Sequence, residues 1–259
     1  MSDWGWPGLI AHRCGGALAP ENTLAGLGIA ARLGCVAVEF DAMLSADGVP
    51  LLIHDETLER TAGVTGRVAA LPAAALLATD VGRRHHPAFS GETLPSLDAA
   101  LRRCHTLGLA VNLEIKPAEG FEVATGREIG RALAALPPAL RPALLLSSFS
   151  ADALASAAER VPDLPRAFLV EAFHTDAIDT ARRLGCAALN LSRQGLAPAQ
   201  VAAVNGAGLR CLVYTVNCPD EARRLAAWGV AGVFSDRPDL LLSASASQFS
   251  GRSALIRSA

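Results

Sequence analysis

Short apolar runs alternate with segments of helical periodicity along nearly the whole chain, and this alternation restricts the possible folds more than any other feature. The runs span residues 8–12, 36–41, 49–54, 110–116, 143–147, 166–170, 187–191, 210–216 and 230–235. Most are almost continuously apolar, which is typical of strands buried on both faces of a sheet. Segments of helical period separate most of them, at 23–33, 96–107, 151–160, 177–184 and 219–228. Alternation over about 240 residues predicts a parallel sheet closed into a (β/α)8 TIM barrel.

One connection is too short for a helical crossover. Only about eight residues separate Asp41 from Pro50, whereas parallel neighbours need a dozen or more. Asp47-Gly48 lies at the centre of this connection, and Asp-Gly between apolar runs is a hairpin signal. We therefore predict that the third run folds back antiparallel on the second, which leaves eight parallel strands. This folding brings His54 beside Glu39 and Phe40.

Several helices are preceded by a residue type that commonly caps a helix N-terminus. Asn22, Ser96 and Ser150 occupy such positions, and we predict that each caps the helix that follows it.

Composition excludes several classes of protein. The 259 residues are 51% hydrophobic with a formal net charge of −2, so we expect neither global disorder nor a nucleic-acid groove. No run reaches the roughly 18 apolar residues of a membrane-spanning helix, and the N-terminus has no secretory signal. We expect a cytoplasmic protein without stable membrane insertion. Its six cysteines have no metal-binding spacing, so we expect them to be buried small apolar residues.

The predicted domain organisation is simple. Residues 1–242 are expected to form a single barrel domain, with residues 56–95 as a small insertion after the hairpin that follows strand 2. Residues 243–259 are rich in Ser and Ala and are expected to form a flexible C-terminal tail. The oligomeric state cannot be predicted from these features.

Three acidic residues near strand ends suggest a metal site. In a parallel barrel, the carboxyl ends of all strands face one rim, where barrel enzymes place their active sites. Glu39 and Asp41 are two residues apart on one strand and share a face, and Glu114 can join them from another strand. Oxygen ligands of this kind suit one divalent cation, Mg²⁺ or Ca²⁺. The alternative is that these acids pair with Arg13 or Lys116 without a metal.

Two histidines and two cations accompany these acids. His12 and His54 are the histidines that end predicted strands, and a histidine pKa near neutrality suits general acid and base roles. Arg13 and Lys116 supply positive charge at the same rim, where a guanidinium and an ammonium can bind a phosphate. Lys116 is the only lysine among 23 basic residues. Together these residues predict a pocket for a phosphate-containing anion.

These residues fall within a longer series of motifs, and the chain resembles the glycerophosphodiester phosphodiesterase family, particularly its bacterial cytoplasmic branch. The resemblance extends in order from residue 8 to about 242. The motifs are His12-Arg13, Ala19-Pro20-Glu21-Asn22-Thr23, Val38-Glu39-Phe40-Asp41, Asp47-Gly48-Val49-Pro50, His54-Asp55, Gly91-Glu92-Thr93-Leu94-Pro95-Ser96-Leu97, Leu113-Glu114-Ile115-Lys116-Pro117, Ser147-Ser148-Phe149, Tyr214-Thr215-Val216-Asn217 and Ser235-Asp236-Arg237-Pro238.

The resemblance implies a set of residue roles. It makes His12 and His54 the acid–base pair, Arg13 and Lys116 the phosphate contacts, and Glu39, Asp41 and Glu114 the metal ligands. It also implies that Glu21 supports the site and that Tyr214, where tryptophan is common in the family, forms part of the substrate wall. Cys14 stands where the family more often has glycine, and we interpret it as a small-residue substitute.

The implied activity is hydrolysis of a glycerophosphodiester to sn-glycerol 3-phosphate and an alcohol, through a cyclic phosphate intermediate. One alternative is a lysophospholipase D-like phosphodiesterase. Such an enzyme would need apolar side chains at the rim beside the pocket, and the candidates are Phe89, Phe149, Phe173 and Tyr214. A second alternative is a non-catalytic phosphate-binding barrel.

Overall fold

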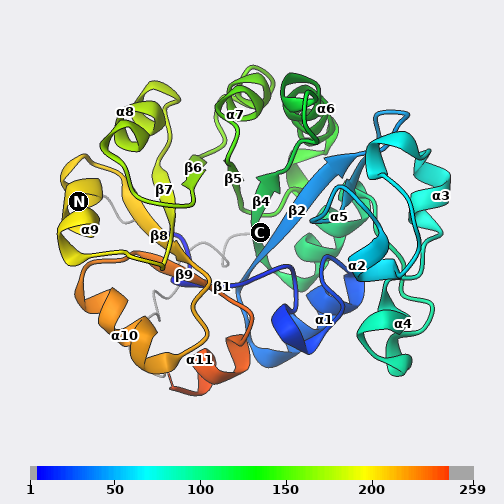
Figure 1. Cartoon of the computed structure of the whole chain (residues 1–259), viewed down its shortest axis with the longest axis horizontal. Helices are drawn as coiled ribbons and strands as arrows, with labels where there is room; N and C mark the ends of the chain where they lie inside the picture. Colours follow the sequence, from blue (N-terminus) through cyan, green and yellow to red (C-terminus); the bar gives the residue numbers. More distant parts are fainter. Residues whose placement is uncertain (1–4, 245–259) are drawn as a thin grey trace.

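A closed barrel of eight parallel strands forms the centre of the computed structural model, which describes residues 5–244 (Figure 1). The sheet order is β1-β9-β8-β7-β6-β5-β4-β2-β3, and a parallel pairing of β1 with β2 closes the barrel. The strands are β1 (Leu9–Ala11), β2 (Ala37–Leu44), β3 (Pro50–Leu52), β4 (Ala110–Ile115), β5 (Leu144–Ser148), β6 (Arg166–Val170), β7 (Ala188–Ser192), β8 (Arg210–Tyr214) and β9 (Gly232–Ser235). The predicted (β/α)8 TIM barrel is confirmed.

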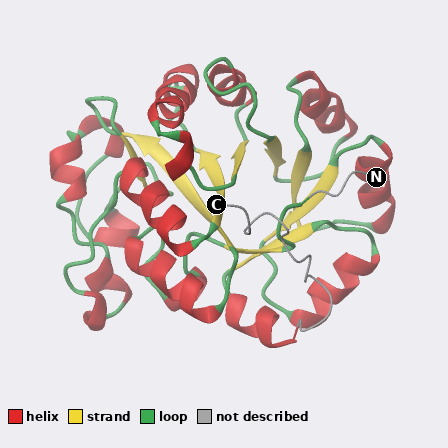
Figure 2. Cartoon of the chain, turned by 180° about the vertical axis from the view of Figure 1, so that it is seen from behind, coloured by secondary structure: helices red, strands yellow, loops and turns green. Residues whose placement is uncertain are grey.

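Helices surround the barrel and cover the outer face of its strands (Figure 2). The longer ones are α1 (Leu24–Leu33), α5 (Leu97–Leu107), α6 (Glu122–Ala135), α7 (Ala151–Ala158), α8 (Thr175–Arg183), α9 (Pro198–Gly206), α10 (Pro219–Ala227) and α11 (Pro238–Ala244). Two short 3₁₀ segments, η1 (Gly16–Leu18) and η4 (Pro138–Leu140), lie in the connections. Within residues 5–244, no helix is both long and apolar enough to cross a membrane.

Apolar side chains fill the barrel below the rim. Residues from successive strands form a buried cluster inside the barrel, and they are Ile10, Ala37, Leu145, Ala167, Ala188, Leu212 and Phe234. A second, larger cluster packs the outer faces of the strands against the helices. Because strand residues alternate between these two layers, the polar side chains two or four positions further along point into the barrel mouth.

The hairpin prediction is also confirmed. Strand β3 pairs antiparallel with β2, with Ala42 opposite Leu52 and Leu44 opposite Pro50. The Ile53 amide continues this register by donating to the Asp41 carbonyl at 3.1 Å. His54 therefore follows the short return strand and reaches the rim beside the acids of β2.

Residues 56–95 form a layer of short helices beside the hairpin (Figure 1). They are α2 (Glu59–Ala62), η2 (Val68–Ala70), α3 (Ala73–Leu77), α4 (Gly82–His85) and η3 (Pro87–Phe89). A separate apolar cluster, which includes Leu58, Val68 and Leu76, packs them against Met43 and Leu51 of the hairpin. Of the tail expected at 243–259, the first two residues end α11 and the remainder lies outside the described residues.

The cap predictions succeed at two positions and are wrong at the third. The side chains of Ser96 and Ser150 accept hydrogen bonds from the amides of the first turns of α5 and α7. The cap of α1 is instead Thr23, and Asn22 before it has a left-handed backbone with φ of 57°. The side chain of Asn22 is thereby turned away from the helix and toward β2.

The cysteine prediction is correct for five of the six residues. Cys14, Cys35, Cys104, Cys186 and Cys211 are buried and free, whereas Cys218 is exposed.

Candidate active site

A pocket of about 370 Å³ opens at the carboxyl ends of the strands. It brings together all of the predicted site residues except Glu21, which contacts Arg13 from behind. The lining residues are His12, Arg13, Glu39, Asp41, His54, Asn112, Glu114, Lys116, Ser147, Phe149, Leu169, Glu171, Asn190, Tyr214, Thr215 and Phe234.

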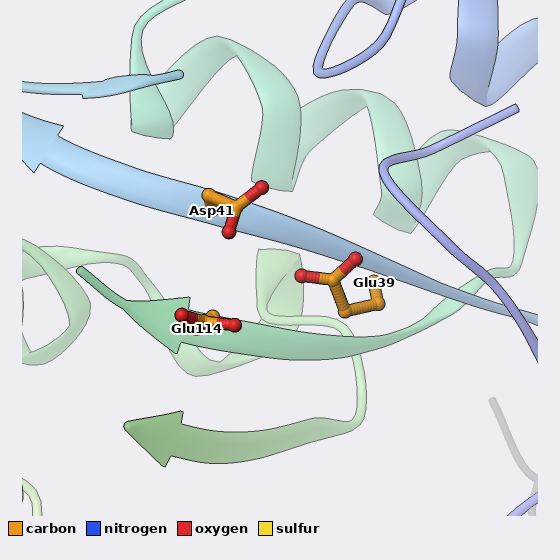
Figure 3. A group of neighbouring side chains, drawn as sticks. All are labelled: Glu39, Asp41 and Glu114. Carbon is orange, nitrogen blue, oxygen red and sulfur yellow. The ribbon is translucent and has the colours of Figure 1, made fainter. Parts of the chain in front are cut away.

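Three buried carboxylates converge on one side of this pocket (Figure 3). Glu39 and Asp41 come from β2, and Glu114 lies opposite Asp41 in the register of β4. One carboxylate oxygen from each lies within 4.8 Å of the others. Burial, followed by the nearby charge of Asp41, raises the pKa of Glu114 to about 7, and the same causes raise the pKa of Glu39.

The donor set fits a hard divalent cation. Glu39 Oε1 is buried and has no hydrogen-bond partner among residues 5–244, while its Oε2 accepts from the Arg13 amide at 2.8 Å. Lys116 Nζ lies 3.5 Å from Glu114 and 3.9 Å from Asp41, and Arg13 Nε lies 3.8 Å from Asp41. These cations therefore offset the acids only in part. Carboxylate oxygens at this spacing are the ligands that Mg²⁺ and Ca²⁺ prefer.

Asn22 fixes the orientation of Asp41. Its Nδ2 donates to Asp41 Oδ2 at 2.9 Å, and the Asp41 amide donates back to Asn22 Oδ1 at 3.0 Å. Both residues are almost fully buried. Asp41 Oδ1 takes no part in this pair of hydrogen bonds and lies 3.9 Å from Lys116 Nζ.

The turn after β1 places Arg13 at the rim. Arg13 and Cys14 have left-handed backbones, with φ of 49° and 75°, which residues with a Cβ adopt at an energetic cost. Two hydrogen bonds to Glu39 hold this turn: its carboxylate accepts from the Arg13 amide and its carbonyl from the Cys14 amide. Cys14 is fully buried, and burial raises the pKa of its thiol well above its usual value. We therefore interpret Cys14 as a structural residue.

His12 is oriented by an acid behind it. His12 Nδ1 lies 2.7 Å from Asp236 Oδ1, and Asp236 is itself held by the side chain of Asn217. Nδ1 therefore carries the proton shared with the carboxylate. Nε2 faces the pocket, 3.9 Å from Glu39 Oε2.

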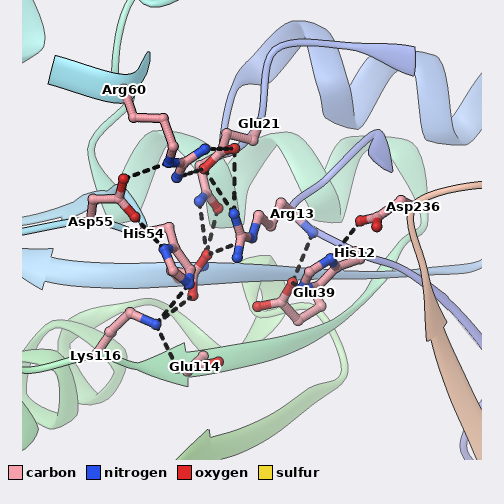
Figure 4. Close-up of polar contacts among 12 residues, drawn as sticks. His12, Arg13, Glu21, Glu39, His54, Asp55, Arg60, Glu114, Lys116 and Asp236 are labelled. Carbon is pink, nitrogen blue, oxygen red and sulfur yellow. Dashed lines mark hydrogen bonds and ion pairs between the residues drawn. The ribbon is translucent and has the colours of Figure 1, made fainter. Parts of the chain in front are cut away.

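His54 has the same arrangement on the opposite side. Its Nδ1 lies 2.6 Å from Asp55 Oδ1, and its Nε2 lies 2.9 Å from Lys116 Nζ (Figure 4). An ammonium can only donate, so Nε2 accepts and Nδ1–H donates to Asp55. Burial is the main cause that lowers the pKa of His54. The two histidines thus present their Nε2 atoms to one pocket.

Behind Arg13, a chain of ion pairs leads away from the pocket. Arg13 Nη1 lies 3.3 Å from Glu21 Oε1, and Glu21 in turn accepts two hydrogen bonds from Arg60, at 2.6 and 2.8 Å. Burial opposes ionisation of Glu21, but the Arg60 hydrogen bonds and the Arg13 charge together lower its pKa. Glu21 therefore holds both guanidinium groups.

The opposite wall and the floor of the pocket combine aromatic and amide groups. The Tyr214 hydroxyl donates to the Val170 carbonyl at 2.9 Å, and its ring packs edge-on against Phe149 with ring centres 6.1 Å apart. Asn190 is fully buried, and neither polar atom of its side-chain amide has a hydrogen-bond partner within residues 5–244. Asn112, on the floor, donates to Ser147 Oγ at 2.8 Å.

Two of the four aromatic residues that were expected beside the pocket lie away from it. Phe149 and Tyr214 line the pocket. Phe89 instead packs against His85 in the insertion, and Phe173 packs against the larger core cluster.

Several functional contacts were not identified from the sequence. Asp55 and Asp236 fall within the motifs that carry the family resemblance, but the sequence does not predict their hydrogen bonds to the two histidines. Their positions directly after His54 and at the end of β9 were the available signals. No local sequence pattern predicts that Asn22 contacts Asp41 or that Arg60 contacts Glu21.

Comparisons with known proteins identify the family of the chain. Residues 12–240 match the Glycerophosphoryl diester phosphodiesterase family. The glycerophosphodiester phosphodiesterase of Caldanaerobacter subterraneus subsp. tengcongensis is 27% identical over 234 residues, covering 90% of this chain and 96% of that protein. An Oleispira antarctica phosphodiesterase, solved in complex with the product sn-glycerol-3-phosphate, is 36% identical with a TM-score of 0.89, covering 93% of this chain and 97% of that one. A glycerophosphodiester phosphodiesterase structure from Agrobacterium tumefaciens is 26% identical with a TM-score of 0.72, covering 92% and 100%.

The fold and the pocket therefore define a barrel enzyme of the phosphoric diester hydrolase class. The chain belongs to the Glycerophosphoryl diester phosphodiesterase family, as its sequence motifs predicted. The alternative of a non-catalytic phosphate-binding barrel is set aside.

Proposed function

We propose that this protein hydrolyses glycerophosphodiesters to sn-glycerol 3-phosphate and an alcohol, using one divalent cation. The observation that carries the proposal is the convergence of three buried carboxylates, two carboxylate-oriented histidines and two cations in one pocket. The Oleispira antarctica relative, which was solved with the product of this reaction, adds support.

Glu39, Asp41 and Glu114 would hold the cation, either Mg²⁺ or Ca²⁺. When bound, the cation supplies Lewis-acid stabilisation of negative charge on phosphoryl oxygens. The unpartnered Oε1 of Glu39 and the raised pKa values of Glu39 and Glu114 support this role, because positive charge relieves the repulsion among the three acids.

Arg13 and Lys116 bind the phosphate group beside the acids. Arg13 offers a planar fork for two phosphate oxygens, and Lys116 contributes a compact charge. Glu21 holds the Arg13 guanidinium from behind, which keeps the fork directed into the pocket.

His12 and His54 transfer protons at their Nε2 atoms. One histidine accepts the proton of a substrate glycerol hydroxyl, whose oxygen then bonds to phosphorus as the bond to the alcohol breaks. The other histidine donates a proton to the departing alcohol oxygen, and a cyclic glycerol phosphate remains. Water opens this ring with the two roles reversed, which regenerates both histidines. Asp236 and Asp55 keep each ring in the required tautomer.

The floor of the pocket suits a polyol. Both polar atoms of the buried Asn190 amide and the Asn112 Oδ1 atom lack hydrogen-bond partners among the described residues. Because buried amide groups are stabilised by partners, these atoms favour a ligand with hydroxyl groups. We assign them to the glycerol moiety, with Tyr214 as the adjacent wall.

A lysophospholipid is the second candidate substrate, because Phe149 at the pocket is 42% exposed and contacts Tyr214. Comparing turnover of a lysophospholipid and glycerophosphocholine at equal concentrations distinguishes the two. We expect the protein to prefer glycerophosphocholine.

Phosphorus NMR of glycerophosphocholine hydrolysis tests the proposal. We expect sn-glycerol 3-phosphate as product, complete loss of activity after chelation, and recovery when Mg²⁺ or Ca²⁺ is added. Activity that survives chelation contradicts the metal assignment, and absence of turnover with every glycerophosphodiester contradicts the substrate assignment.

A further inference from the structure

Arg60 links the insertion to two sides of the active site, the side of Arg13 and the side of His54. It belongs to the short helix α2 (Glu59–Ala62), within residues 56–95, and does not line the pocket itself. Its Nη1 and Nη2 donate to the two oxygens of Glu21, at 2.6 and 2.8 Å, and its Nε donates to Asp55 Oδ2 at 2.5 Å. One guanidinium therefore binds two carboxylates from different parts of the chain (Figure 4).

Each of these carboxylates contacts a proposed functional residue on its other side. Glu21 contacts Arg13 at 3.3 Å, and Asp55 contacts the His54 ring nitrogen at 2.6 Å. The order Arg13–Glu21–Arg60–Asp55–His54 thus joins the phosphate-binding side of the pocket to one acid–base histidine.

We propose that Arg60 is a positioning residue, which sets the orientation of Arg13 through Glu21 and the orientation of His54 through Asp55. This inference rests on the proposed function for the roles of Arg13 and His54. The insertion after the hairpin thereby acts on the active site through a single side chain.

The geometry gives Arg60 a separate effect on each neighbour. Without Arg60, Glu21 pairs with Arg13 alone, which neutralises that guanidinium and draws it away from a phosphate. Without Arg60, Asp55 has one fewer donor and can rotate, so that its hydrogen bond to His54 Nδ1–H weakens and the ring is held less firmly. The first change raises KM and the second lowers kcat.

The backbone of α2 is also fixed in place. The Arg60 carbonyl accepts a hydrogen bond from Arg84 Nε of α4 at 2.7 Å. The insertion helices therefore hold the position from which the Arg60 side chain extends. In agreement with the two contacts, hydrogen bonding to Arg60 is the largest cause that lowers the pKa of Asp55, to about 2.

A role in stability alone predicts a different outcome. The Arg60 side chain is 47% exposed, and ion pairs at exposed positions contribute little to stability. We therefore expect Arg60→Met to change Tm only slightly. Arg67 is a matched control, because it lies in the same insertion, is 66% exposed and pairs with Glu56.

The experiment compares Arg60→Met, Arg60→Lys and Arg67→Met in the metal-loaded protein with glycerophosphocholine. We expect Arg60→Met to lower kcat/KM by about 10–100-fold, with changes in both kcat and KM. Arg60→Lys keeps the positive charge but loses the planar guanidinium that donates to two carboxylates, so its activity should be intermediate. Arg67→Met should match the wild type. Wild-type kcat and KM in Arg60→Met would overturn the proposal.

A mutant cycle with Asp55→Asn tests the His54 branch. If Arg60 acts on kcat through Asp55, adding Arg60→Met to Asp55→Asn should lower kcat by much less than it does alone. Fully additive effects on kcat would contradict this route.

The hydrogen bond between His54 and Asp55 gives a readout that needs no substrate. The His54 Nδ1–H proton resonance should lie far downfield in the wild type and in Arg67→Met, as expected for a short hydrogen bond to a carboxylate, and should move upfield or broaden by exchange with water in Arg60→Met. An unchanged Nδ1–H resonance in Arg60→Met would refute the His54 branch even if activity falls. Because this measurement does not depend on turnover, a wild type inactive toward glycerophosphodiesters would refute the proposed function while the spectra still decide the role of Arg60.

Discussion

Glu114→Gln should stabilise the metal-free protein at alkaline pH, although it removes a proposed metal ligand. Glu114 is buried beside Asp41, and burial together with this neighbouring charge raises its pKa from 4.5 to about 7. Glutamine keeps the size of the side chain and removes the charge. In the absence of a cation, the substitution therefore removes one of three mutually repelling acids.

The pKa shift fixes the sign and the size of the effect. A raised pKa means that the folded protein binds the proton more tightly than the unfolded chain, so Glu114 imposes no cost below about pH 4.5. The cost appears as the pH rises from about 4.5 through 7. The rise from 4.5 to about 7 corresponds to about 3 kcal/mol, all of which is present at pH 8.5. For a chain of this size, that is about 6–12 °C in Tm.

Thermal and urea unfolding in the presence of a chelator measures this difference between pH 4.5 and 8.5. We expect Glu114→Gln to exceed the wild type in stability at pH 8.5 and to approach it at pH 4.5. Adding Mg²⁺ or Ca²⁺ should stabilise the wild type strongly and the variant weakly, since a ligand stabilises the state that binds it. Glu171→Gln removes one negative charge from an exposed position in the same pocket and should show neither effect. A metal-free Glu114→Gln less stable than the wild type at pH 8.5, or a difference independent of pH, would refute the reasoning.

Four further substitutions test the other groups of the pocket. His12→Ala and His54→Ala should each lower the kcat for glycerophosphocholine by about 10²–10⁴-fold, with circular dichroism spectra like the wild type, and near-wild-type turnover in either would contradict its assignment. Lys116→Arg should lower kcat/KM at least about tenfold, or 1.4 kcal/mol, without a matching loss of Tm, and full activity would show that any cation suffices there. Asn190→Leu should weaken inhibition by sn-glycerol 3-phosphate about tenfold but leave inhibition by inorganic phosphate unchanged, whereas equal effects on both ligands would exclude a glycerol contact.

The fold was predictable because the relevant signals are local and repeated. Each apolar run predicts a strand buried on both faces, and each Ala- and Leu-rich segment predicts a helix. A wrong prediction at a single position therefore does not change the predicted architecture. The hairpin was equally accessible, because the short connection around Asp47-Gly48 excludes a crossover. The barrel then directs all strand ends to one rim. For this reason, Glu39, Asp41 and Glu114 could be grouped although 73 residues separate the second from the third.

The supporting contacts were not predictable, because they depend on tertiary geometry that leaves no periodic signal. Asn22 precedes α1 and has a good capping side chain, but its left-handed backbone directs that side chain to Asp41. Two buried hydrogen bonds to Asp41 replace the single bond of a cap, which Thr23 provides instead. Arg60 lies in an insertion without strong periodicity, and its partners are 39 and 5 residues away.

Lys116 illustrates how the structure gives physical meaning to a composition signal. A chain with 22 arginines and one lysine places that lysine where three groups converge on a single nitrogen. Lys116 Nζ lies 2.9 Å from His54 Nε2, 3.5 Å from Glu114 Oε1 and 3.9 Å from Asp41 Oδ1. The three N–H bonds of an ammonium diverge from one atom and can meet partners in different directions, whereas a guanidinium presents its donors in one plane. The donor geometry therefore accounts for lysine here better than charge alone, since arginine carries the same charge and is abundant elsewhere in the chain.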